Sequence, residues 1–167
     1  MGGLWKGFFD LFSLNFIDKI PKLVGVQAEG AKPIVQAIRG DGVIKPVIPN
    51  TVADSICVGQ PRDGRKAIRA IRRSKGMAVS VADEEILKAE IFLARKTGIF
   101  AEPAAAAAFA GFIKLVHEGS FTSSEAVVVM ITGNGLKDVD SVKHVVKTPQ
   151  AIEPRIEDVE KIVGGET

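Results

Sequence analysis

Thr132, Gly133 and Gly135 lie in the stretch MITGNGLKD, where the residue types suit ligand binding. The preceding run AVVVMI predicts a strand over 126–131, and its lack of alternation indicates burial on both faces. Ligands of α/β proteins bind at the carboxyl ends of strands, and glycines that permit positive φ allow backbone amides to meet an anion or the partner of a ring nitrogen. A glycine turn that only reverses the chain explains the same residues, because the spacing matches neither a Walker nor a dinucleotide fingerprint.

Glu102 is the second candidate, because it also lies where a strand is expected to end and a helix to begin. The run GIFA predicts a short strand over 98–101, and Pro103 suits the first turn of the following helix. A carboxylate at this position could face a ligand. It could equally be an N-terminal cap favoured by the helix dipole, and from spacing alone this simpler role is the better interpretation.

Cysteine and histidine positions indicate no metal or nucleophile motif. Cys57, His117 and His144 are isolated in the sequence, so neither zinc spacing nor a Cys–His pair is found. A single cysteine permits no internal disulfide, which favours a reducing cytoplasm.

The composition is that of a soluble globular chain. Its 167 residues are 46% hydrophobic with a net charge of +2, which gives no general reason to expect a nucleic-acid or membrane partner. Lys6, Asp10 and Asp18 interrupt the apolar runs near the N-terminus, so no secretory or membrane-spanning segment is predicted there.

Alternating strands and helices are expected to position the candidate residues. Periodicity and breaker residues predict helices over 3–18 (with Trp5 as a core anchor), 31–39, 62–75 (ended by Gly76 as a left-handed cap), 83–97 (with Gly98 past its end), 103–119, 139–146 and 154–163, and further strands over 22–27 and 77–81. Residues 40–61 read as a long ordered connection. This pattern predicts an α/β fold of three layers with a largely parallel sheet, in which 1–147 form the domain and 148–167 a tail with a short helix.

Two helices have unusual compositions. The alanine face, Ala104 to Ala108, allows close approach to a sheet or to a flat ligand, although alanine also favours helix formation without any ligand. The helix over 62–75 carries a basic set that could follow phosphates: Arg62, Arg65, Lys66, Arg69, Arg72, Arg73 and Lys75. No aromatic residues are interleaved and neighbouring segments are acidic. A solvated helix face is therefore a better interpretation of these basic residues than a nucleic-acid or polyphosphate site.

Five segments resemble, in the same order, the C-terminal part of threonine synthase. They are GLWKGFFDL, IDKIPKLVGVQAEG, RKAIRAIRRSKG, VADEEILKAEIFLARKTGIFAEPAAAAA and VVMITGNGLKD, and the likeness covers residues 2 to about 140. The resemblance implies a partial pyridoxal-phosphate domain of fold type II. It also implies the activity of a lyase of threonine biosynthesis, which converts O-phospho-L-homoserine and water to threonine and phosphate.

The same resemblance assigns expected roles to the candidate residues. Thr132 matches the hydroxyl residue that hydrogen-bonds the pyridine nitrogen of pyridoxal phosphate, with Gly133 in the same loop. Glu102 is expected near the cofactor ring. A neutral hydroxyl partner leaves the pyridine nitrogen largely unprotonated, which favours replacement and elimination chemistry over transamination.

Several family features have no counterpart in the sequence. The Ser-x-Lys-Asp type motif of the Schiff-base lysine is missing, and Met1 stands where the phosphate loop should be ending. Ala105 stands where Ser is common, and Ala82 replaces a Ser or Thr cap. We therefore expect a C-terminal half that has no catalytic residue of its own and is inactive alone. Its expected partner is a separate N-terminal chain or a second copy, and the alternatives are a non-catalytic subunit or a nucleic-acid or polyphosphate module.

Overall fold

A two-stranded parallel sheet lies at the centre of the computed structural model, which describes residues 1–143, 146 and 151–164. Strand β1 (Val24–Ala28) pairs with β2 (Met77–Val81), in register from Val24 with Met77 to Ala28 with Val81. The helices are α1 (Gly2–Ser13), α2 (Pro33–Arg39), α3 (Gly64–Arg73), α4 (Asp83–Thr97), α5 (Pro103–His117), α6 (Val139–Lys143) and α7 (Ile156–Gly164), with short turns η1 (Glu29–Ala31), η2 (Asp54–Ile56) and η3 (Gly135–Lys137).

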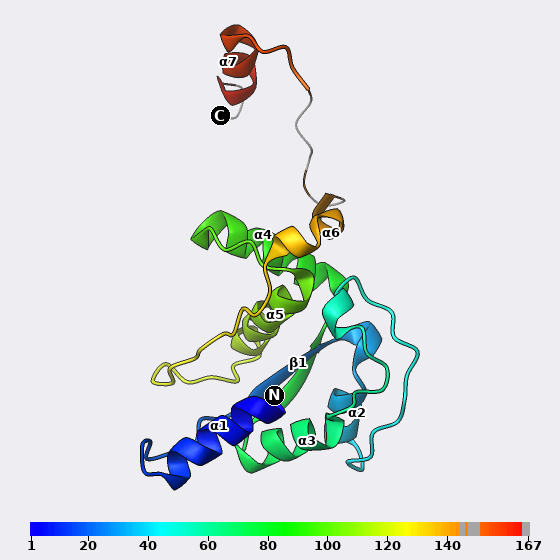
Figure 1. The fold of residues 1–167 in the computed structure, drawn as a ribbon, viewed down its shortest axis with the longest axis vertical. Coiled ribbons are helices and arrows are strands. Elements are labelled where there is room, and N and C mark those ends of the chain that lie inside the picture. The colour runs from blue at the N-terminus through cyan, green and yellow to red at the C-terminus, as the bar shows by residue number, and fades with distance from the viewer. Residues whose placement is uncertain (144–145, 147–150, 165–167) are drawn as a thin grey trace.

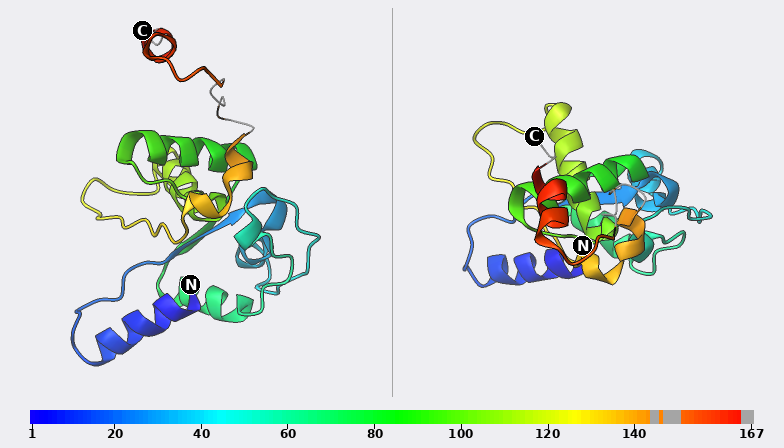
Figure 2. Two further views of the ribbon diagram at one scale, coloured as in Figure 1. Left: turned by 45° about the horizontal axis from the view of Figure 1, so that its top comes forward. Right: turned by 90° about the horizontal axis from the view of Figure 1, so that it is seen from above.

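Helices cover both faces of this sheet and form the predicted three-layer α/β arrangement (Figures 1 and 2). Helices α2 and α3 pack on one face, while α5 packs on the other with α4 against it. A Cβ atom on Gly25 of β1 would lie 2.9 Å from Ile71 Cδ1 of α3. One on Gly111 of α5 would lie 2.5 Å from Cγ2 of Val26, the next residue of β1. Because successive strand residues point to opposite faces, glycine permits close approach on each side of β1.

The alanine run forms the inner face of α5. Residues 105–107 and Ala110 are buried in one cluster with Val81 of β2 and with Ile86 and Leu93 of α4. Small side chains allow α5 to lie close to both the sheet and α4. Packing alone therefore accounts for this face, and no ligand is needed to explain it.

No side chain in the described residues replaces the missing hydroxyl cap at Ala82, and the acidic side chains at the start of α4 make other hydrogen bonds. The Glu85 carboxylate accepts a hydrogen bond from the Ala82 backbone N–H at 2.7 Å. Asp83 turns away from the helix and accepts hydrogen bonds from the Val52 N–H, at 3.0 Å, and from the Thr51 hydroxyl. The Asp83 carboxylate therefore links the long connection between α2 and α3 to the N-terminus of α4.

The segment 126–131 is not a strand, contrary to the prediction from its apolar run. Val128 is 82% exposed and Met130 is 51% exposed, so the expected burial on both faces is also wrong. A strand needs hydrogen-bonding neighbours, and no other segment of the described chain pairs with this one. Most of its apolar side chains face solvent, and only Ile131 at its end packs against the core cluster.

Helix α1 lies at the surface, and the prediction that Trp5 anchors a core is wrong. None of its residues is buried, and Trp5 is half-buried beside Phe9, with ring centroids 6.3 Å apart. The helix packs mainly against α3, and it ends earlier than predicted because Asn15 adopts a positive φ of 58°.

Two smaller predictions also fail. The run GIFA contributes a single bridge, Ala101 with Asn134, in place of a strand. The left-handed residue after α3 is Lys75, with φ of 55°, and not Gly76. Gly76 is small for another reason, since a Cβ there would lie 1.9 Å from the Leu23 carbonyl oxygen.

The C-terminal helix α7 lies apart from the layered body in Figures 1 and 2. The predicted helix over 139–146 is present as α6, although residues 144–145 lie outside the described part. The division into 1–147 and 148–167 stays a prediction. No helix in the described residues has the length and apolar character needed to span a bilayer.

Candidate functional site

The segment containing Glu102 lies directly beside the segment containing Thr132 and Gly133. The Glu102 backbone N–H donates to the Gly133 carbonyl at 3.1 Å, and the Gly135 N–H donates to the Phe100 carbonyl at 2.8 Å. These two hydrogen bonds flank the Ala101–Asn134 bridge. The structure therefore gathers the three residues singled out from the sequence at one place, close to the N-terminus of α5.

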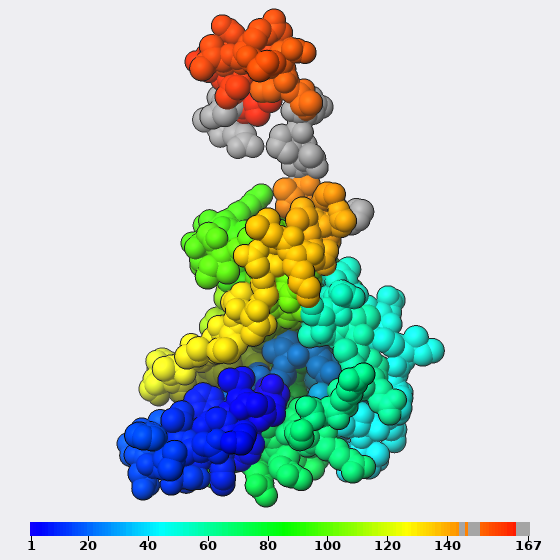
Figure 3. All heavy atoms as spheres, viewed as in Figure 1, coloured from blue at the N-terminus to red at the C-terminus, as the bar shows by residue number. Residues whose placement is uncertain are grey.

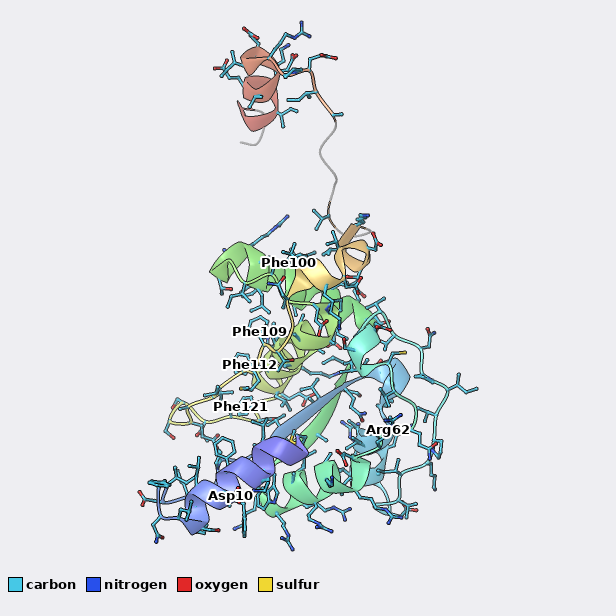
Figure 4. The ribbon with its side chains drawn as sticks, in the orientation of Figure 1. Asp10, Arg62, Phe100, Phe109, Phe112 and Phe121 are labelled. Carbon is cyan, nitrogen blue, oxygen red and sulfur yellow. The ribbon has the colours of Figure 1, made fainter. Side chains whose placement is uncertain are left out.

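Gly133 and Gly135 are required for close approach and not for positive φ. A Cβ on Gly133 would lie 2.2 Å from Glu102 Oε1, and one on Gly135 would lie 2.6 Å from the Phe100 ring, which Figure 4 labels. The described glycines with positive φ lie elsewhere in the chain. The expectation of positive φ at this loop is therefore wrong. The simpler interpretation, a turn that only reverses the chain, is also wrong, because any side chain at Gly133 would displace the Glu102 carboxylate.

The Glu102 carboxylate is nearly buried and electrostatically paired. Its side chain is 11% exposed, and Oε2 lies 3.1 Å from Lys137 Nζ and accepts from the Ser55 hydroxyl at 3.4 Å. Lys137 Nζ also donates to Ser55 Oγ at 2.7 Å. The carboxylate makes no hydrogen bond to the N–H groups of α5, so it is not the side-chain cap that the simpler interpretation predicted. Its charge is instead balanced by an ammonium group.

The Thr132 side chain is exposed and makes no hydrogen bond within the described part of the chain. Its hydroxyl can therefore donate to, or accept from, a group that arrives from solvent. Gly133, the next residue, lies against the Glu102 carboxylate, whose charge is balanced by Lys137. This surface therefore presents a neutral hydroxyl close to a carboxylate that is already paired.

Sequence reasoning missed Ser55 and Lys137. Lys137 was within reach of prediction, because it lies in the same GLKD motif as the glycine loop. Ser55 lies in η2 of the connection after α2, where no periodicity indicates which side chain faces the sheet.

A second buried carboxylate was also missed. Glu90 of α4 has no exposed surface, and neither of its side-chain oxygens has a hydrogen-bond partner in the described chain. The pKa of Glu90 is raised from 4.5 to about 7, chiefly by burial and to a smaller extent by the nearby Asp138 carboxylate. Since Asp138 follows Lys137, the loop of the candidate site is adjacent to both buried carboxylates.

The remaining candidates do not join this site. His117 is exposed at the end of α5, Cys57 is a free half-buried thiol, and His144 lies outside the described residues. Within the described ranges, no group of three or more His, Cys, Asp or Glu side chains could hold a metal ion.

Comparison with known proteins decides the family. The family model described as "Pyridoxal-phosphate dependent enzyme" matches residues 1–133, which include α1 to α5 and the Thr132–Gly133 pair. The chain belongs to this family of pyridoxal-phosphate dependent enzymes. The matched region ends at Gly133, so all three residues predicted from the resemblance fall inside it.

Curated relatives agree with this family. The chain is 44% identical over 155 residues to the threonine synthase of Methanocaldococcus jannaschii, covering 92% of this chain and 38% of the relative. It is 44% identical over 164 residues to that of Methanosarcina acetivorans, with 97% and 40% covered. It is 37% identical over 163 residues to that of Halalkalibacterium halodurans, with 96% and 44% covered. The chain thus spans about two fifths of the length of these relatives and corresponds to a C-terminal portion of them.

Solved structures support the fold. Maize serine racemase superposes with a TM-score of 0.52 at 19% identity, covering 69% of this chain and 36% of that one. The T.th. threonine deaminase gives 0.51 at 23% identity, with 70% and 40% covered. Both likenesses agree with a partial fold type II domain, as the resemblance implied.

Proposed function

We propose that this chain is the C-terminal part of a threonine synthase. Joined to the N-terminal part, it would convert O-phospho-L-homoserine and water to L-threonine and phosphate. The identity of 37–44% to three threonine synthases, over nearly all of this chain, supports the proposal. The observation that carries it is the pairing of the AEP and TGNG segments, which sets the free Thr132 hydroxyl beside a neutralised Glu102.

These residues fit one end of pyridoxal phosphate. Thr132 offers a neutral hydroxyl to the pyridine nitrogen, and Gly133, which has no side chain, lets the Glu102 carboxylate lie directly against the same loop. Contacts with Lys137 and Ser55 restrict rotation of the Glu102 side chain, so its carboxylate stays fixed at the edge of the site. When bound, the cofactor supplies an electron sink for the substrate carbons. The part of this chain is to orient the ring and to keep its nitrogen neutral.

We further propose that this chain alone forms no threonine. Neither a Ser-x-Lys-Asp motif nor a glycine-rich phosphate loop occurs in its sequence. The chain then depends on a partner for the lysine amine that bonds covalently to the cofactor and for the loop that binds the cofactor phosphate.

The test is reconstitution. The chain is mixed with a recombinant polypeptide that carries the N-terminal portion of the Methanocaldococcus jannaschii threonine synthase, preceding the portion matched here. Threonine and phosphate formation are measured with pyridoxal phosphate and O-phospho-L-homoserine. We expect activity only when both chains are present, and sustained phosphate release by this chain alone would contradict the proposal.

A matched pair of variants tests the role of Thr132. Thr132→Val removes the hydroxyl and is expected to lower reconstituted kcat by about tenfold or more and to shift the cofactor absorbance band. Thr122→Val makes the same change at an exposed position in the loop after α5 and is expected to leave both unchanged. Equal effects of the two variants would remove Thr132 from the cofactor site.

A further inference from the structure

Four arginines of α3 line a shallow concavity of about 450 Å³ on the α2–α3 face of the sheet. Gly42 and Ile68 complete its lining, and the four residues are Arg65, Arg69, Arg72 and Arg73. Figure 4 labels Arg62, which precedes α3 on this side of the molecule. The Glu102 site lies across the sheet, at the N-terminus of α5.

The four arginines lie along one stripe of the helix. Their spacing of i, i+4, i+7 and i+8 places them on one side, and all four are exposed. The apolar residues between them are buried, namely Ala67, Ile68, Ala70 and Ile71, whereas Lys66 is exposed. The fold therefore fixes the backbone from which these guanidinium groups project into the concavity.

None of the four arginines has an acidic partner within the described residues. The acid closest to them in sequence, Asp63, is already paired with Lys66 at 2.9 Å, and Asp41, next to Gly42 of the lining, lies 3.7 Å from Lys45. Like charges three and four positions apart repel one another along a helix. The dipole of α3 favours cations in its last turn, which accounts for Arg72 and Arg73 but not for Arg65 and Arg69.

The charge of this segment stands out from that of the whole chain. Residues 62–75 hold seven of the 22 basic residues and one of the 20 acidic residues. The rest of the chain therefore has more acidic than basic residues, and a mobile anion is attracted to this face in preference to others.

The turn after α2 positions one of the guanidinium groups. Gly42 has φ of 84° and donates its N–H to the Ala37 carbonyl at 2.9 Å. A Cβ at this position would lie 2.9 Å from Arg72 Nη2. The backbone of the turn thus lies against the Arg72 side chain and limits where it can point.

We infer that this arginine-lined concavity binds a compact anion with several phosphate groups, such as tripolyphosphate or the phosphate chain of a small metabolite. Arginine forks bind phosphate oxygens in pairs, and four of them require more than one phosphate group. No aromatic residue lines the concavity, so a nucleobase would find no ring on which to stack. The phosphate chain, and not a base, carries the binding, which favours a small polyanion over a nucleic acid.

Titration calorimetry with sodium tripolyphosphate on the purified chain tests this inference. We expect saturable binding in about 20 mM NaCl that weakens by about tenfold or more in about 200 mM NaCl, as ion release requires. The double variant Arg69→Gln/Arg72→Gln is expected to bind at least about tenfold more weakly. The control Arg95→Gln/Lys96→Gln, which removes two exposed charges from the last turn of α4, is expected to bind as the unchanged chain does.

Three results would overturn the inference. They are the absence of binding in low salt, an equal loss in both double variants, and binding of a single-stranded oligonucleotide without binding of tripolyphosphate. If the glutamine variant loses its native circular dichroism, Arg69→Lys/Arg72→Lys replaces it. That variant keeps the charge but loses the forked geometry, and it must bind several-fold more weakly for the inference to hold.

Discussion

At the scale of single residues, the candidate site depends on the Glu102 carboxylate, which forms an ion pair with a cation, Lys137. Glu102 is nearly buried, whereas its partner Lys137 has a side chain that is 62% exposed. A nearly buried negative charge is unfavourable without a nearby cation or several hydrogen bonds. Lys137 therefore stabilises the loop that presents Thr132.

Replacing Lys137 tests this arrangement. Lys137→Met is expected to lower the free energy of unfolding by about 1–3 kcal/mol, because Glu102 is left nearly buried without a cation. Adding Glu102→Gln is expected to recover part of the loss. Urea unfolding measures both. Lys88→Met, which breaks an exposed pair with Glu84, is the control and should change stability by less than about 0.5 kcal/mol.

Glu90 makes stability depend on pH. Its folded pKa of about 7 lies above the ordinary 4.5, so the folded state holds the proton more tightly than the unfolded state does. Stability is therefore greatest below about pH 4.5 for this group and falls by up to about 3 kcal/mol as the pH rises through 7. Glu90→Gln is expected to remove this slope in urea unfolding between about pH 5 and 8.

The exposed Glu84 on the same helix provides the control. Glu84→Gln should retain the slope, since the pKa of Glu84 is lowered by its hydrogen bond with Lys88 and not raised by burial. An unchanged slope in Glu90→Gln would show that another group titrates.

At the scale of elements, helix α5 packs directly against the sheet. Small residues form its inner face, and Gly111 meets Val26 of β1 with no space for a methyl group. The helix in turn supports the Glu102 end of the site, because the N–H groups of Ala105 and Ala106 in its first turn donate to the Glu102 carbonyl. A shift of α5 would therefore move the carboxylate.

Glycine-to-alanine changes separate close packing from helix propensity. Gly111→Ala is expected to destabilise the chain by about 1–3 kcal/mol despite the better propensity of alanine, since its Cβ would overlap Val26. Gly7→Ala in α1, where nothing lies within 4 Å, should stabilise by up to about 1 kcal/mol. Thermal unfolding of both variants checks the opposite signs.

The sequence predicted elements well where their partners lie in the same chain. The strands over 22–27 and 77–81 and the helices that became α2 to α5 are confirmed within a few residues, because periodicity and caps are local signals. The run over 126–131 carries an equally clear signal of burial. Burial, however, depends on a neighbour, and the described chain provides none, so this prediction failed.

The site could be predicted in part for the same reason. Glu102, Thr132 and Gly133 follow apolar runs and so could be located from the pattern of the chain. Ser55 lies in a connection without periodicity, and its contact with Glu102 spans 47 positions. Such a contact is set by the three-dimensional path of the loop and leaves no trace in local spacing.

At the scale of the whole molecule, one face exposes apolar side chains on two adjoining segments. Helix α1 and the segment 126–131 both appear on the face shown in Figure 3, and Lys22 Nζ lies 2.8 Å from Glu125, which joins their connections. The exposed large apolar residues of these two segments are Leu4, Phe9, Leu11, Phe12, Val127, Val128 and Met130. Such a patch is typical of an interface. We propose that the chain carrying the N-terminal part covers it, because the relatives are more than twice as long.

Polar substitutions on α1 test this interface. Phe9→Ser/Phe12→Ser is expected to weaken association with the N-terminal polypeptide by about tenfold or more, measured by sedimentation, because both rings are exposed and would be lost from the contact. Val43→Ser/Ile48→Ser, exposed in the connection after α2, should have no effect. Self-association that persists while the N-terminal polypeptide does not bind would indicate a second copy as the partner.

The parallel pairing of β1 with β2 has a consequence for folding kinetics. Its strands are separated by α2, the long connection and α3, so that Leu23 and Ser74, which are hydrogen-bonded just before the strands, stand 51 positions apart. A loop of this length must close before either strand gains a hydrogen bond, and the entropy lost in closure delays pairing relative to helix formation. The helices are therefore formed early, while the strand edges stay open to other molecules, and refolding yield should fall as protein concentration rises.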